Sequence, residues 1–180
     1  MTDVLDEHSS IKYKIGKRRL LAAILDAIIV SVPYLVVTQN ATHFENYTLV
    51  FWVAIIYPII QISYSVLGHY YYGQTLAKSV LNIKVTDISE SRKLTFKQAI
   101  YRDSVWILVE IGGFVALILQ SYNLYTDSMF FNTVSFIANG FATWWFLLEV
   151  VTMFTNKKRR AIHDFLAGTV VIKDSATISG

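Results

Sequence analysis

The chain has 180 residues, of which 54% are hydrophobic and 14% aromatic, and this composition is too apolar for a soluble domain of that size. The formal net charge of +3 would suit nucleic acid, but the basic residues flank apolar segments and do not cover one face. Anionic lipid headgroups are therefore the expected counter-charge, and nucleic acid is excluded as a partner. The absence of cysteine excludes disulfides and thiolate metal sites.

The positions of the basic residues predict the topology. All 16 Lys and Arg residues fall in three blocks, at 12–19, 78–102 and 157–173, and two long apolar segments between them contain none. Cationic segments beside membrane-spanning helices stay in the cytoplasm. We therefore expect an all-α polytopic protein of the cell inner membrane. Its four transmembrane helices form two hairpins, and both termini and the middle loop are cytoplasmic.

Four segments are long and apolar enough for a helix that crosses a hydrocarbon core, which takes about 20 residues. The first is expected to stay in the mature protein, because Asp26 interrupts its apolar run and makes it unlike a signal peptide. We expect a cytoplasmic segment at 1–19, a membrane domain at 20–172 and a tail at 173–180. The predicted spans are 20–38, 49–67, 103–121 and 129–154, and the external turns are 39–48 and 122–128.

The middle loop carries its own structural signals. From Thr75 to Lys84 the apolar residues have helical spacing, which is typical of a short helix lying at the membrane interface. The alternation of apolar and polar residues from Ile83 onward suits a short strand equally well, and both interpretations remain open. Thr95 and Gln98 have capping-box spacing, so the third helix is expected to start in the cytoplasm and to run through Arg102.

Three segments together resemble the RDD family of membrane proteins, which is named for an arginine and two aspartates. They are the stretch from Arg19 to Asp26, the central stretch from Gly73 to Arg102, and the closing stretch from His163 to Val171. The resemblance runs from about residue 16 to 172 and departs from the family pattern at Ala77 and Ser79, where Gly and a basic residue are expected. It implies a membrane protein, with cation/proton exchange and regulation of other membrane proteins both associated with the family.

Three carboxylates are expected inside the membrane at one depth. Asp26 follows Arg19 by seven residues, Glu110 follows Arg102 by eight, and Glu149 precedes the third basic block by eight, which places each about 10 to 12 Å from the inner interface. An aspartate at the centre of a membrane helix costs about 2.5 to 3.5 kcal/mol. Their common level therefore suggests function. Asn139 joins them as a candidate from a polar stripe on the fourth span, formed by Asn132, Ser135, Asn139 and Thr143.

Two hypotheses account for the charged residues. In the structural one, Arg19, Asp26, Arg102 and Asp164 form buried ion pairs that stabilise the bundle, with Arg102 as the expected partner of Asp26. In the functional one, Asp26, Glu110 and Glu149 bind protons and cations in turn, because burial raises carboxylate pKa values. His163 beside Asp164 is expected to be a capping or packing pair.

No enzymatic motif is present, so we expect a protein that is not an enzyme and needs neither cofactor nor metal site. The leading function is cation/proton exchange with Na⁺, K⁺ or H⁺ as substrates. The alternative is a non-catalytic regulatory or assembly subunit that binds another membrane protein. Four helices form a thin wall for a pathway, so a homo-oligomer or a second membrane protein is the expected partner besides the lipid bilayer.

Overall fold

Four long helices dominate the molecule. The computed structural model describes residues 13, 15–121 and 128–174, without the side chains at 117–121, 128–135 and 138–139. Each predicted apolar segment lies in one helix. These helices are α2 (Gly16–His43), α3 (Tyr47–Leu67), α5 (Phe96–Ser121) and α6 (Ser128–Thr155).

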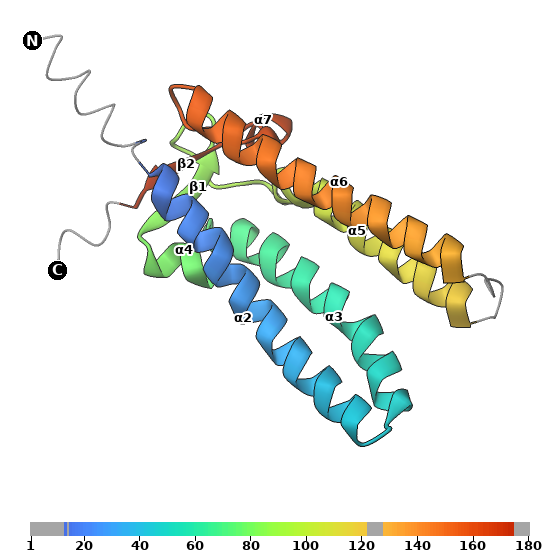
Figure 1. Cartoon of the computed structure of the whole chain (residues 1–180). Coiled ribbons are helices and arrows are strands. Elements are labelled where there is room, and N and C mark those ends of the chain that lie inside the picture. The colour runs from blue at the N-terminus through green and yellow to red at the C-terminus, as the bar shows by residue number, and fades with distance from the viewer. Residues whose placement is uncertain (1–12, 14, 122–127, 175–180) are drawn as a thin grey trace, which may run out of the picture.

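The first two helices are joined by a tight turn and lie antiparallel against each other (Figure 1). Asn46 is the N-cap of α3. Its side chain accepts a hydrogen bond from the Leu49 N–H at 3.1 Å, a group that has no acceptor within the first turn of the helix. The helices α5 and α6 extend away from the same end of the molecule as α2 and α3. The termini of the described chain lie at that end too.

Apolar side chains of the long helices face outward. The segments Gly16–His43 and Tyr47–Tyr72 are long and apolar enough to cross a membrane, yet only 6% of each most apolar 18-residue window is buried. The core helix of a soluble protein would bury most of such a window. The outward exposure of large residues such as Leu35 and Ile60 is the arrangement that a lipid environment favours.

A small subdomain closes the end where the long helices meet. It consists of the π-helix η1 (Gly68–Tyr72), the short helices α4 (Leu76–Val80) and α7 (Ile162–Ala167), and the strands β1 (Ile83–Asp87) and β2 (Thr169–Lys173). The strands pair antiparallel with Val85 opposite Val171. These two side chains and Ile83 pack on Ile15 and Ala22 to form a buried apolar cluster.

This subdomain corrects the expected all-α architecture. The sequence left a helix and a strand open for the segment from Thr75 to Lys84, and both are present: the helix α4 ends at Val80 and the strand β1 begins at Ile83. The partner strand β2 was not predicted, since the apolar run from Val170 to Ile172 is too short to separate a strand from a helix. Lys173 belongs to this strand and not to a tail.

Two local signals position the elements around the subdomain. The predicted capping box is confirmed: the Thr95 N–H donates to Gln98 Oε1 at 2.9 Å, and the Gln98 N–H donates to Thr95 Oγ1 at 3.2 Å. The helix α5 therefore begins at Phe96, before its apolar segment. Gly73 ends η1 with φ of 72°, and a Cβ atom there would lie 2.9 Å from the Val85 carbonyl oxygen, so only glycine fits this turn.

Candidate functional site

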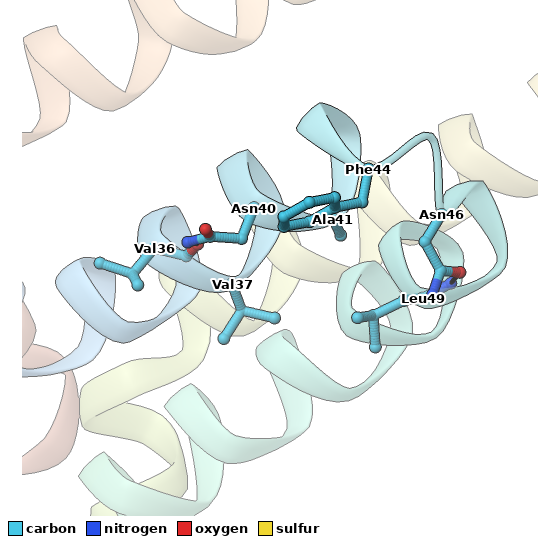
Figure 2. A pocket seen from close by; sticks show the side chains of 7 residues that line it. All are labelled: Val36, Val37, Asn40, Ala41, Phe44, Asn46 and Leu49. Carbon is cyan, nitrogen blue, oxygen red and sulfur yellow. Dashed lines mark hydrogen bonds between the residues drawn. The ribbon is translucent and has the colours of Figure 1, made fainter.

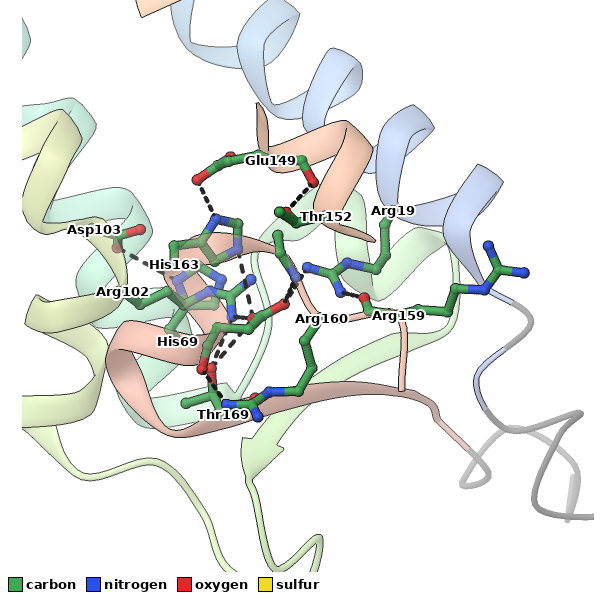
Figure 3. Close-up of polar contacts among 12 residues, drawn as sticks. Arg19, His69, Arg102, Asp103, Glu149, Thr152, Arg159, Arg160, His163 and Thr169 are labelled. Atoms are coloured by element: carbon green, nitrogen blue, oxygen red, sulfur yellow. Dashed lines mark hydrogen bonds and ion pairs between the residues drawn. The ribbon is translucent and has the colours of Figure 1, made fainter. Parts of the chain in front are cut away.

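A cluster of charged side chains joins the long helices to the small subdomain. Figure 3 shows residues from α2, α5, α6 and α7 converging there, together with His69 from η1. The cluster has two parts. One surrounds Asp164 and the other surrounds Asp26.

Asp164 accepts hydrogen bonds from two arginines that come from different helices. Arg19 Nη2 of α2 lies 2.6 Å from Asp164 Oδ2, and Arg102 Nη1 of α5 bonds to Oδ1. The Asp164 side chain has no exposed surface, and Arg19 and Arg102 are 7% and 5% exposed. Burial alone would raise the pKa of Asp164, but Arg102 and then Arg19 hold it well below its ordinary value of 3.8. We name these three residues the Asp164 triad.

Backbone groups make further hydrogen bonds to the Asp164 triad and to the arginine next to it. The Asp164 carboxylate also accepts the Ala161 N–H at 2.9 Å, which caps the first turn of α7. Arg160 donates to the Asp164 carbonyl and to the Thr169 carbonyl, both at 2.9 Å, and so ties α7 to β2. The triad therefore links α2, α5 and α7 through one buried carboxylate.

Asp26 lies in a separate shell of donors. It accepts from the Tyr64 hydroxyl at 2.5 Å, the Thr75 hydroxyl at 2.6 Å and the Ala77 N–H at 3.3 Å. Lys78 Nζ lies 3.8 Å from Asp26 Oδ2. The expected pairing of Asp26 with Arg102 is wrong, because Arg102 bonds to Asp164 and the fold places α4 over Asp26.

Lys78 continues the shell toward α5. Its Nζ lies 3.0 Å from His69 Nε2, and His69 Nδ1 lies 3.6 Å from Asp103 Oδ2. The Lys78 side chain is 14% exposed, and burial together with the Arg102 cation lowers the pKa of its ammonium from 10.5 to about 8. The shell thus contains a lysine that can lose its proton near neutral pH.

The other predicted acids lie apart from Asp26. Glu149 Oε1 lies 2.5 Å from His163 Nδ1 and accepts from Trp145 Nε1 at 2.9 Å. Glu110 is half-buried on α5 and has no bonding partner within the described residues. No hydrogen bond or ion pair of the described side chains joins any two of the three carboxylates, and their expected action in turn at one depth stays a prediction.

His163 Nε2 lies 3.6 Å from Asp164 Oδ1, which agrees with the expected pair, and its Nδ1 makes a closer contact with Glu149, at 2.5 Å, that was not expected. The side chain of Asn139 lies outside the described residues, so its candidacy stays a prediction. Within the described part of the chain, no group of three or more His, Asp or Glu residues is arranged to hold a metal ion.

The sequence model of the RDD family matches residues 15–168. The chain belongs to the RDD family. The match covers the Asp164 triad and the whole shell around Asp26, which confirms the resemblance expected from Arg19, Asp26 and Asp164. No curated protein and no solved structure matches the chain significantly.

Sequence reasoning missed the roles of four residues in this RDD protein's site. His69 lies at a π-helix that sequence spacing does not reveal, and it turns inward until only 1% of it is exposed. Asp103 follows Arg102 directly and was included in the third span without a role. Thr75 and Lys78 belong to the segment expected at the membrane interface, although the fold places both beside Asp26.

Two hollows lie on the α2–α3 pair of the RDD protein. Figure 2 shows the outer one, a space of about 280 Å³ beside the turn that joins the helices, lined by Val37, Phe44 and Leu49 together with the amides Asn40 and Asn46. No titratable side chain lines it. The inner one, of about 390 Å³, lies between the two helices and reaches Tyr64 and Leu76, which border the Asp26 shell.

Proposed function

We propose that this RDD protein is an integral protein of the cell inner membrane with four spans arranged as two hairpins. The exposed apolar surface of the long helices supports this, since exposing so much apolar area to water would be unfavourable. The basic residues that the structure describes lie in the subdomain or at the adjoining ends of the long helices, so we place both termini and the middle loop in the cytoplasm.

We further propose that it exchanges a cation for a proton at Asp26, and that it is not an enzyme. The observation that carries this proposal is the pairing of Asp26 with Lys78 at 3.8 Å inside a shell of hydroxyl oxygens. A carboxylate with hydroxyl neighbours offers the oxygen ligands that hard cations prefer. The lysine occupies the place of such a cation in the resting protein.

Exchange then follows from competition between two positive charges for one carboxylate. When a cation approaches Asp26, the Lys78 ammonium loses its favourable partner and releases one proton, and the electron pair stays on Nζ. The total charge of the site is the same before and after. The lowered pKa of Lys78, about 8, makes this proton loss accessible near neutral pH.

The remaining acids have secondary roles in this proposal. The Asp164 triad holds α2, α5 and α7 together, so it positions Asp26 without binding the cation. Glu110 has no bonding partner within the described residues and suits a second station for the ion, deeper in the helices. We keep Glu149 and Asn139 as further candidates on α6, and a homo-oligomer as the assembly that encloses the pathway.

The alternative function, a regulatory or assembly subunit for another membrane protein, is favoured by the aromatic surface of α6. Phe136, Trp144 and Phe146 are all exposed there, and aromatic side chains are enriched where protein partners meet. In that function the charged cluster would only stabilise the fold.

Liposomes that contain this protein alone test the exchange function. A pH-sensitive dye inside them should report proton movement when Na⁺ or K⁺ is added, because each bound cation displaces a proton. Asp26→Asn should abolish the signal. Glu45→Gln, an acid-to-amide change in the exposed outer turn, is the matched control and should leave it unchanged.

Wild-type liposomes that show no cation-dependent proton flux at any pH from about 6 to 9 would overturn the exchange function. If crosslinking in cells then joins this protein to one other membrane protein, the regulatory function would be established. Equal flux from wild type and Asp26→Asn would also contradict the role of Asp26.

A further inference from the structure

The inner hollow between α2 and α3 is a groove whose lining includes exposed side chains. We name it the α2–α3 groove; it has a volume of about 390 Å³, with Ile29 and Pro33 on one wall and Val53 and Ile60 on the other. Ile60 is 56% exposed, and Leu76 at the inner end is 62% exposed. A ligand dissolved in the surrounding membrane therefore reaches the groove without passing through the charged subdomain.

Tyrosine rings give this apolar groove a preference for positive charge. Tyr34, Tyr57 and Tyr64 all line it, and the rings of Tyr34 and Tyr57 lie 4.2 Å apart between their centroids. Aromatic faces attract cations, most strongly where water is excluded. Pro33 has no N–H, so the carbonyl of Ile29 lacks its helical donor and adds further negative potential to the same wall.

The inner end of the groove touches the proposed cation site. Tyr64 and Leu76 both line the groove. The Tyr64 hydroxyl donates to Asp26 Oδ1 at 2.5 Å and accepts the Leu76 N–H at 3.0 Å. One hydroxyl group thus separates the groove from a carboxylate.

We propose that the α2–α3 groove binds a lipophilic monovalent organic cation, whose apolar body lies between the helices and whose charge is held by Asp26. This inference rests on the proposed function, because it uses the same carboxylate. It names the class of cation that the walls fit. A hydrated inorganic ion gains nothing from apolar walls, and a lipid acyl chain gains nothing from three tyrosines and a carboxylate.

Binding of tetraphenylphosphonium to the purified full-length protein in detergent tests this inference. Wild type should bind it, and triphenylmethane, an uncharged compound with a similar aromatic body, should bind at least about tenfold more weakly. Val53→Trp should fill the groove and reduce binding by a similar factor. Val32→Trp, on α2 but outside the groove, is the matched control and should bind as wild type does. Asp26→Asn should weaken binding as well.

The outcomes separate this inference from the exchange function. Tetraphenylphosphonium binding that fails in wild type, or that Val53→Trp leaves unchanged, would overturn the groove as a site, even where Na⁺ flux is present. Equal binding of the charged and uncharged compounds would assign the groove to an apolar occupant such as an acyl chain. Binding that requires both the groove and Asp26, without Na⁺ flux, would support the organic cation and refute inorganic ion exchange.

Discussion

Asp164→Asn should strongly destabilise the protein. This substitution keeps the size of the side chain and an oxygen that can accept the Ala161 N–H, but it removes the negative charge between Arg19 and Arg102. The side chains of the two arginines are only 6% and 4% exposed, so water cannot replace the lost partner. Breaking a buried ion pair on one side costs about 3 to 5 kcal/mol, a large part of a typical folding free energy.

Unfolding of purified protein by a denaturing detergent, followed through the fluorescence of the four tryptophans, measures this loss. Adding Arg102→Leu to Asp164→Asn should restore part of the stability, since it removes one unpaired charge. Glu110→Gln, a similar change on α5 at a residue with no bonding partner in the described chain, is the control and should be near neutral. An Asp164→Asn protein within about 1 kcal/mol of wild type would refute the role of the triad.

Low pH should remove the stabilisation that the Asp164 ion pairs contribute. The pKa of Asp164 is lowered in the folded protein, so its stabilising effect is fully present above the ordinary value of 3.8 and is lost as the pH falls through the lower folded value. The difference in unfolding free energy between wild type and Asp164→Asn should therefore be constant from about pH 5 to 7 and should shrink below about pH 4. A difference that persists unchanged in strong acid would contradict the ion-pair explanation.

Three further outcomes are expected. Gly73→Ala should lower stability by about 1 to 3 kcal/mol in the same unfolding assay, because φ is positive there. Gly113→Ala, inside α5 and with no atom within 4 Å of an added Cβ, should leave stability unchanged or raise it by up to about 1 kcal/mol, since alanine favours the helix interior. A cysteine at Ser89 should be shielded from an impermeant thiol reagent in intact cells, and one at Thr42 should react. Wild-type cation-driven proton flux should fall as the pH rises through about 8, because Lys78 then has no proton to release, and Lys78→Gln should show no such flux at any pH.

The long elements were predictable because their signals are local. Apolar runs of about 20 residues and the capping box at Thr95 each depend on neighbours in sequence, and the helices follow them. Arg19 and Asp164 were correctly singled out as members of a buried ion pair. Their family pattern gave the residue types, and the structure gave the partners.

The partner of Asp26 was not predictable for a reason of geometry. Spacing along one helix gives the depth of a side chain, but it does not give the rotation of the neighbouring helices or the path of a loop. After α3 the chain forms the π-helix η1 at His69 and then folds back, which places Thr75 and Lys78 beside Asp26 of α2. The strand β2 places α7 beside Arg102, so the arginine bonds to Asp164.

Proton release during Na⁺ binding tests the central claim most directly. Na⁺ added to the purified protein in weakly buffered detergent near pH 7.5 should release about one proton for each ion bound, because the ion replaces the Lys78 ammonium beside Asp26. Asp26→Asn should release none, and Lys78→Gln should bind Na⁺ without acidifying the solution. Na⁺ binding to wild type without proton release, or equal release from Asp26→Asn, would contradict competition between the two charges at this carboxylate.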